Sequence, residues 1–170
     1  EVDAWGDEGS KRKTNYHLTL LAKNLEGYLN LCRMSYIAHT EGFYYKPRVS
    51  FSTLAKHSEG LIVLSGCLGS MLAAAARENE PEKATRAIAQ QHKDIFCEDY
   101  YLELQSHDIP AQINLNKHCI ALSKELDIPL VATTDAHFIL KSNKHLHDCI
   151  MCIQTGDTLD NPDRFSLEES

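Results

Sequence analysis

The sequence has 170 residues, of which 43% are hydrophobic and 24% are charged. This composition is typical of a globular domain and excludes collagen-like, low-complexity and intrinsically disordered chains. The longest apolar runs are far shorter than the roughly 20 residues that a membrane-spanning helix needs. The formal net charge is -7, so the surface as a whole repels nucleic acid, and any contact with DNA would need a local basic patch.

The two ends and the cysteines bear on the origin of the chain. It begins Glu1-Val2-Asp3 without a methionine or a signal peptide and stops in an acidic stretch, so we expect a piece of a longer polypeptide. Six cysteines without a secretory segment favour reduced thiols in a cytoplasmic protein over a disulfide framework.

Short β-like runs alternate with amphipathic helices along the chain. Each run is rich in branched and aromatic residues and is bounded by turn or capping residues. The expected strands are residues 16–22, 61–65, 100–104 and 129–134. This alternation predicts an α/β fold with a parallel sheet or barrel, in which active groups lie where strands end.

Four helices have readable boundaries. Asn24 can cap a helix that runs to about Thr40, while Pro81 begins one that ends near Phe96 and Pro110 begins another. The helix after Pro110 has a stripe of residues expected to be buried, namely Leu115, Cys119, Leu122 and Leu126. The last helix is expected to run from Ser142 to Gly156 and to bury Leu146, Cys149, Ile150 and Ile153.

Asp135 and His137 follow the apolar run of the last expected strand. If strand geometry persists, residues two apart share a face, so the carboxylate and the imidazole would point the same way. Together they could hold one divalent cation. The alternative is an aspartate that caps the following turn, with the histidine packed beside it.

Cys67 follows the strand at 61–65 and precedes an Ala-rich helix. A thiol at a helix N-terminus can act as a nucleophile. A phosphatase of that kind would need an arginine six residues later, where this chain has Ala73. Two interpretations of Cys67 stay open, namely a soft metal ligand and a buried structural cysteine.

Other polar residues lie near strand ends or among aromatic residues. His17 lies at the opening of its strand, which by position alone places it away from a site at the strand C-termini. Gln105 and His107 end the strand at 100–104 and are candidates to support a site. Lys46 and Arg48 follow three aromatic residues, in a pattern that could contact bases and phosphates or could simply form a covering turn.

Seven strings in chain order resemble the PHP (polymerase and histidinol phosphatase) domain of bacterial DNA polymerase III alpha subunits. Together they cover roughly residues 14–167, which makes the resemblance far more specific than any single motif. The strings are YHLTLLAKN at 16–24, GYLNL at 27–31, EGFYYKPR at 41–48, EGLIVLSGCL at 59–68, YLELQ at 101–105, VATTDAH at 131–137 and CIQTG at 152–156.

This resemblance implies an α/β fold that is part of a distorted (β/α)7 barrel. The partial PHP domain would span residues 1–156, and residues 157–170 would be a linker toward the following polymerase region. The resemblance also implies divalent ions, zinc or manganese, bound by His17, Cys67, Asp135 and His137. Glu1 corresponds to a further family carboxylate.

The function implied by the resemblance is that of a DNA-directed DNA polymerase, with magnesium at a separate polymerase site. The barrel itself would be a metal-dependent phosphoesterase, either a 3′–5′ exonuclease or a structural element. DNA and other replisome subunits would be its partners. The opening His-X-His string of the family would lie before Glu1, so this piece alone is expected to be inactive.

Two alternatives stay open at this point. The first is a stand-alone PHP phosphatase that acts on a small phosphomonoester, and the second is a non-catalytic scaffold for other replisome subunits. The strings at 43–48 and 152–156, and the expected linker after Gly156, favour the polymerase subunit.

Overall fold

The computed structural model describes residues 2–5 and 15–166. The chain divides into two compact units, Glu1–Ala132 and Thr133–Ser170. The described strands are β1 (Val2–Trp5), β2 (Tyr16–Ala22), β3 (Arg48–Ser50), β4 (Leu61–Leu64), β5 (Tyr100–Gln105) and β6 (Leu130–Thr133). The described α-helices are α1 (Leu25–Thr40), α2 (Phe51–Lys56), α3 (Met71–Ala75), α4 (Pro81–Phe96), α5 (Pro110–Leu126) and α6 (Lys144–Thr155). Two short 3-10 helices, η1 (Cys97–Asp99) and η2 (Lys141–Asn143), precede β5 and α6.

The strands form one mixed sheet in the order β3-β1-β2-β4-β5-β6. β2 runs antiparallel to both β1 and β4, whereas β4 runs parallel to β5, and β1 runs parallel to β3. The α/β class is therefore confirmed, but the expectation of a parallel sheet is wrong for β2. The barrel is not confirmed, since β3 and β6 are the two edges of the sheet in the described part of the chain.

Local signals placed most of the elements correctly. The Asn24 side chain accepts a hydrogen bond from the Gly27 N–H at 2.9 Å and caps α1. Both α4 and α5 begin at their prolines, as expected of a residue whose missing N–H is not needed there. Gly156 ends α6 in the left-handed conformation at φ 72°, which glycine adopts without steric cost.

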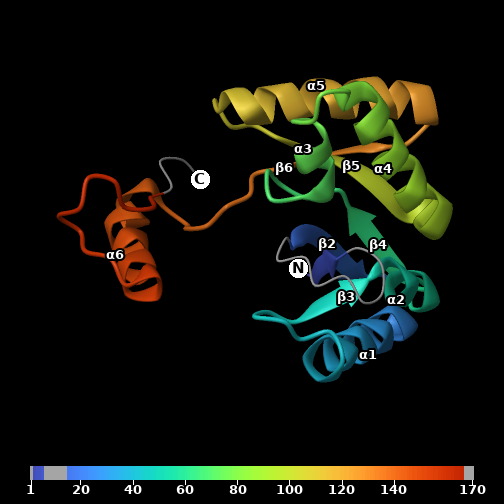
Figure 1. The fold of residues 1–170 in the computed structure, drawn as a ribbon, viewed down its shortest axis with the longest axis horizontal. Coiled ribbons are helices and arrows are strands. Elements are labelled where there is room, and N and C mark those ends of the chain that lie inside the picture. The colour runs from blue at the N-terminus through green and yellow to red at the C-terminus, as the bar shows by residue number, and fades with distance from the viewer. Residues whose placement is uncertain (1, 6–14, 167–170) are drawn as a thin grey trace. The chain divides into compact units, whose positions relative to one another are not determined.

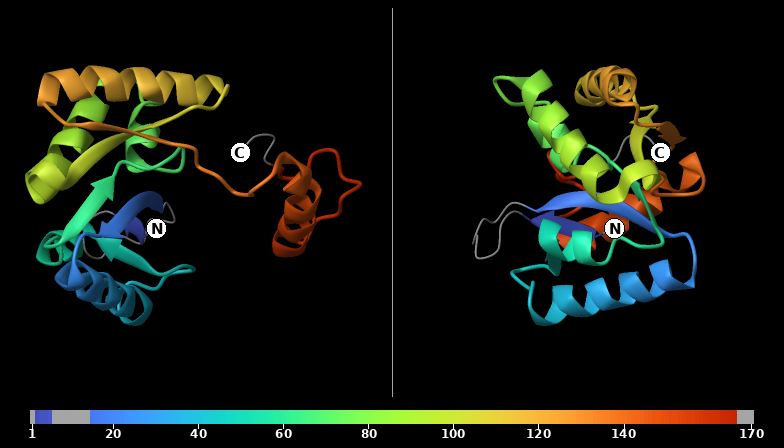
Figure 2. Two further views of the ribbon diagram at one scale, coloured as in Figure 1. Left: turned by 180° about the vertical axis from the view of Figure 1, so that it is seen from behind. Right: turned by 90° about the vertical axis from the view of Figure 1, so that its right-hand side faces the viewer.

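Helices cover both faces of the sheet in the first unit (Figures 1 and 2). α1 lies on one side, and α4 and α5 lie on the other. The expected stripe of α5 is buried as predicted, because it faces β5. The core is a single cluster of apolar side chains contributed by the strands and by all five helices of this unit, including Leu20, Met34, Leu54, Leu72, Ala89, Leu102 and Leu115.

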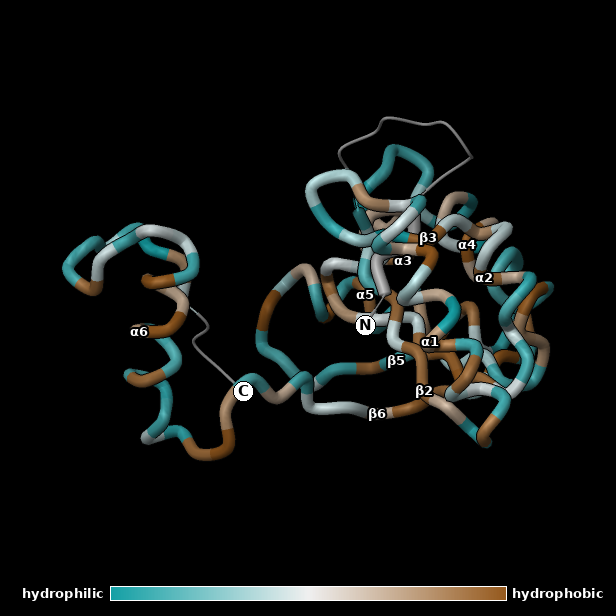
Figure 3. Tube along the Cα trace, turned by 90° about the horizontal axis from the view of Figure 1, so that it is seen from below, coloured by the Kyte–Doolittle hydropathy of each residue, from teal (hydrophilic) through white to brown (hydrophobic). Residues whose placement is uncertain are grey.

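The last helix, α6, buries a different face from the one expected. Leu146, Ile150 and Ile153 are exposed by 59%, 61% and 83%, whereas the buried side chains of α6 are Asp148 and Cys152. Figure 3 shows apolar segments along α6 alternating with polar ones. The prediction was wrong because the apolar stripe has no partner within the described part of this unit, while residues 164–166 bind Asp148 on the other face.

No helix in the described part of the chain is both long enough and apolar enough to span a bilayer.

Candidate metal centre

His17 lies near the start of β2, beside the C-terminal end of β4. The two strands are antiparallel, with Thr19 opposite Leu64, so the beginning of one lies beside the end of the other. Position along the strand predicts the opposite location for His17 only if all strands run parallel. The antiparallel direction of β2 removes the conflict and brings His17 to the loop that contains Cys67.

The loop after β4 brings the thiol of Cys67 close to this imidazole. Cys67 Sγ lies 3.8 Å from His17 Nδ1, although 50 residues separate them in the chain. The backbone N–H of His17 donates to the Gly69 carbonyl at 3.0 Å, which fastens the loop to β2. A Cβ atom at Gly69 would lie 3.1 Å from His17 Nδ1, so glycine permits this close approach.

The distance between His17 Nδ1 and Cys67 Sγ suits two ligands of one metal ion. A nitrogen and a sulfur bound to one tetrahedral zinc ion lie about 3.5 Å apart, given usual bond lengths. The observed 3.8 Å separation of His17 Nδ1 and Cys67 Sγ is close to that value. Both side chains are half-buried, so they are held in place yet are open on one side. The pair therefore fits two of the ligands of a divalent metal ion.

A buried polar network lies directly behind this loop. The Glu103 carboxylate, 6% exposed, accepts hydrogen bonds from the Gly66 N–H and the Gln105 amide, both at 3.1 Å. The Gln105 carbonyl in turn accepts from the Asn116 side chain at 2.8 Å. Gln105 thus braces Glu103, whose carboxylate binds the loop at Gly66. The expected role of Gln105 in supporting a site stays a prediction. Glu103 was not singled out from the sequence, because a glutamate in an alternating strand is usually exposed to solvent.

Asp135 and His137 belong to the second unit, where they follow the end of β6. The strand ends at Thr133 and Asp135 has a φ of 50°, so the alternation of faces that paired the two side chains does not hold. His137 Nδ1 instead contacts the backbone carbonyl of Asp135 at 2.7 Å. His137 is exposed and Asp135 is half-buried.

Glu1, the fifth expected ligand, lies outside the described residues. Among the residues that the structure describes, no three histidine, cysteine, aspartate or glutamate side chains converge on a point that could hold a metal ion. Of the five expected ligands, the first unit thus brings together His17 and Cys67. The remaining assignments stay predictions.

The basic residues expected to face a substrate differ in their surroundings. Arg48 is 2% exposed: it donates to Asn15 Oδ1 at 3.1 Å, and its guanidinium lies 5.0 Å from the ring centre of Tyr44. Lys46 is exposed, and His107 is half-buried. Arg48 is thus held within the fold, and of the two cations only Lys46 offers its charge to solvent.

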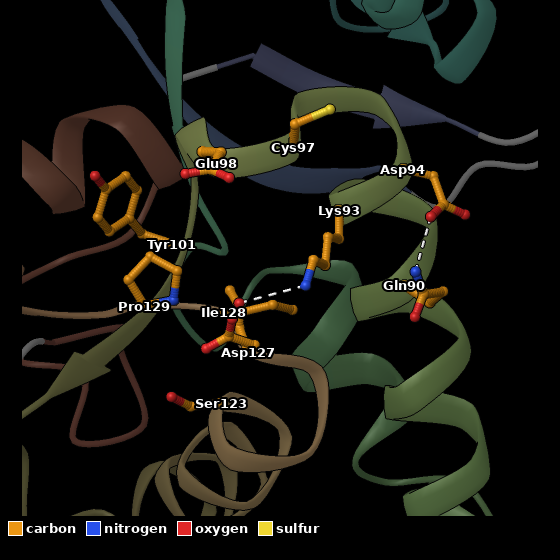
Figure 4. Close-up of a pocket in the computed structure, with 10 residues that line it drawn as sticks. All are labelled: Gln90, Lys93, Asp94, Cys97, Glu98, Tyr101, Ser123, Asp127, Ile128 and Pro129. Carbon is orange, nitrogen blue, oxygen red and sulfur yellow. Dashed lines mark hydrogen bonds between the residues drawn. The ribbon is translucent and has the colours of Figure 1, made fainter.

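A separate surface depression of about 770 Å³ lies between the end of α4, η1 and the turn before β6 (Figure 4). Its one cation, Lys93, donates to the carbonyls of Leu126 and Asp127 at the end of α5. The charged groups that remain along its wall are carboxylates, including Asp94 and Glu98. Neither His17 nor Cys67 lines this depression, and its carboxylates do not suit a phosphate.

Comparison with known proteins identifies the family. The model of the PHP domain matches residues 1–107, which is more than half of the chain. The chain belongs to the PHP domain family. This confirms the resemblance stated from the sequence strings.

Relatives match well beyond residue 107. The DNA polymerase III subunit alpha of Deinococcus radiodurans is 41% identical over 152 residues, which cover 89% of this chain and 11% of the relative. The subunit of Aquifex aeolicus is 42% identical (86% of this chain, 13% of the relative), and that of Borreliella burgdorferi is 40% identical (92% and 14%). The chain is thus homologous to the PHP region of these subunits, and it spans about one eighth of their length.

Proposed function

We propose that this chain is the PHP region of a replicative DNA polymerase alpha subunit and that it contributes a divalent-metal centre to that protein. The similarity to alpha subunits over 86–92% of the chain supports the first part. The protein that carries this region would synthesise DNA in the cytoplasm together with other replisome subunits. Polymerisation would use magnesium at a site outside residues 1–170.

The observation that carries the metal centre is the approach of His17 Nδ1 to Cys67 Sγ. A thiolate and an imidazole favour zinc over magnesium or calcium, and manganese is the weaker alternative for such a pair. Asp135, His137 and Glu1 are the proposed further ligands. A metal held there would polarise a phosphate oxygen as a Lewis acid. Lys46, exposed in the loop before β3, is the proposed contact for the phosphate backbone.

Cobalt binding tests the metal centre. A cysteine ligand produces a sulfur-to-cobalt charge-transfer band in the near ultraviolet, which we expect in the full-length protein and not in Cys67→Ser. His17→Gln should weaken binding and leave the band, since the sulfur ligand remains. Cys97→Ser is the matched control, because Cys97 is an exposed thiol in the same unit. An unchanged band in Cys67→Ser would contradict the assignment.

A non-catalytic, structural centre is the second candidate, because only two of the expected ligands meet within the described residues. A primer labelled at its 3′ end distinguishes the two roles in the full-length protein. If the centre hydrolyses phosphodiesters, Asp135→Ala should remove both a bound metal and the nuclease while DNA synthesis continues. Unchanged nuclease in this variant would contradict the hydrolytic role, and loss of metal without any nuclease in the parent protein would support the structural one.

A further inference from the structure

The loop that contains Cys67 is bonded to neighbouring strands on both sides of the thiol, and the Gly69 N–H also donates to Cys67 Sγ at 3.4 Å. On the C-terminal side, the Gly69 carbonyl accepts the His17 N–H. On the N-terminal side, the Gly66 N–H donates to Glu103 Oε2 at 3.1 Å. Gly66 is buried and has a φ of 85°, so the chain turns sharply at the residue immediately before the cysteine. The Glu103 contact therefore acts at the turn that sets the direction of Cys67.

Glu103 is itself held tightly. Its backbone N–H donates to Ser65 Oγ at 2.9 Å, and the Ser65 N–H donates to the Tyr101 carbonyl at 3.0 Å. Its second carboxylate oxygen accepts from Gln105. The two bonds of Ser65 join the end of β4 to β5 beyond the last ladder pair, Leu64 with Tyr101. The carboxylate thus has a fixed position from which it can place the loop.

Burying a carboxylate is costly unless its oxygens have donors. An apolar residue would fit the core at this position more cheaply, so its polar contacts need another explanation. The carboxylate also acts on a neighbouring thiol. Burial, together with the Glu103 carboxylate, raises the pKa of the Cys119 thiol to about 12. What distinguishes Glu103 from the other buried polar groups of this unit is that it binds the backbone one residue before Cys67.

We propose that Glu103 is a positioning residue, whose buried carboxylate holds the Gly66 N–H and thereby keeps the Cys67 thiol beside His17. The part played by the metal rests on the proposed function, whereas the positioning of the thiol does not. The essential property is a hydrogen-bond acceptor at this point. A glutamine keeps one carbonyl oxygen at the same distance along the side chain. It should therefore substitute for Glu103 when the Gln105 amide turns over to accept from its NH2 group, whereas a leucine should not.

The first test is made on full-length protein in a chelator, with alkylation followed cysteine by cysteine by mass spectrometry. We expect Glu103→Leu to raise the alkylation rate of Cys67 several-fold, and Glu103→Gln to stay near the parent rate. Cys119, fully buried in the same core, reports general unfolding. A rise of Cys119 alkylation equal to that of Cys67 in Glu103→Leu would overturn the proposal.

Asn30→Leu is the matched control. Asn30 is 4% exposed, and its side chain bonds the Glu59 carbonyl and Arg33 rather than the loop. It should lower the stability of the first unit without changing the ratio of Cys67 to Cys119 alkylation. An equal change of this ratio in Asn30→Leu and Glu103→Leu would show that Glu103 has no special role.

Cobalt affinity provides the second readout. Loss of a group that orients a metal ligand typically weakens metal binding about 10- to 100-fold, which we expect of Glu103→Leu but not of Glu103→Gln or Asn30→Leu. Equal affinity in all four proteins would overturn the proposal. Failure of the parent protein to bind cobalt would instead contradict the proposed metal centre, and the alkylation ratio would still decide the role of Glu103.

Discussion

Among the described residues of the first unit, twenty buried apolar side chains form one core between the sheet and its helices. In the described residues of the second unit, the two buried side chains are Asp148 and Cys152, while Leu146, Ile150 and Ile153 are exposed. Asp148 accepts hydrogen bonds from Lys144, Arg164 and Ser166, which tie the segment after α6 to the helix.

This contrast separates two kinds of stabilisation. Burial of apolar surface depends little on direction and adds up over many side chains. A network centred on one carboxylate depends on the charge of that group and on the geometry of each bond. The first unit should therefore respond to changes of side-chain volume, and the second to changes of charge.

Truncation in the core should have the largest effect. Leu115 is 1% exposed on α5, and Leu115→Ala should lower the free energy of unfolding by about 2–5 kcal/mol, because it removes buried methyl groups and leaves a cavity. Ile120→Ala on the same helix, where the side chain is 41% exposed, is the control and should cost much less. Urea denaturation measures both. Equal losses would contradict a core that is confined to the inner face of α5.

Removal of the charge of Asp148 should loosen the second unit. Asp148→Asn retains the size of the side chain but weakens its bonds to Lys144 and Arg164, so amide exchange of residues 157–166 should become several-fold faster. Hydrogen bonds from Lys144 in particular lower the pKa of Asp148 to about 2. The contribution of a carboxyl with a lowered pKa is complete above its ordinary value of about 4 and is lost as the pH falls toward about 2. Protection factors, which divide out the pH dependence of the intrinsic exchange rate, should therefore fall in the parent protein over that interval, and unchanged protection factors would contradict the network.

The first unit has its own pH dependence, at a higher pH. His92 is 3% exposed and stacks on Tyr100 with ring centres 5.2 Å apart, and burial lowers its pKa below 6.5. Its stabilising contribution is complete above about pH 6.5 and declines as the pH falls below that value. We expect the free energy of unfolding to decrease between about pH 7 and about pH 5. His92→Phe keeps a ring and should reduce this slope, and an equal slope in both proteins would exclude His92 as its source.

A change on the exposed face of α6 should have the smallest effect on stability. Ile153 is 83% exposed, so Ile153→Ser should alter the free energy of unfolding by less than about 0.5 kcal/mol, as is usual for surface positions. Thermal unfolding of the full-length protein checks this value. A loss comparable to that of Leu115→Ala would show that this face is covered in the protein, and would remove the contrast between the two units.

Sequence reasoning placed elements well where local chemistry decides them. The start of α1 follows from Asn24, and the starts of α4 and α5 follow from their prolines. It missed β3, because a strand of three residues that begins with an arginine has no apolar alternation to detect. It also chose the wrong face of α6, because periodicity identifies a stripe but does not say whether another surface lies against it.

The candidate site shows the same division. Cys67 was recognisable as a residue that follows a buried strand, and the family strings identified His17. Strand position alone places His17 at the N-terminal end of β4, whereas it lies at the C-terminal end. The direction of β2 relative to β4 depends on pairing between distant segments. Glu103 lies in the strand that leads to the candidates Gln105 and His107, and only the fold shows that its carboxylate meets the Gly66 N–H.

The sequence by itself determined the α/β class, the capped helix starts, the core stripe of α5 and the membership of the PHP family. Each of these depends on residues close together in the chain or on the order of whole strings. The tertiary structure alone decided the direction of β2, the burial of Arg48 and Glu103, and the meeting of His17 with Cys67 across 50 residues. These depend on which distant segments pair, and pairing is set by the packing of the whole unit rather than by the local preference of any one segment.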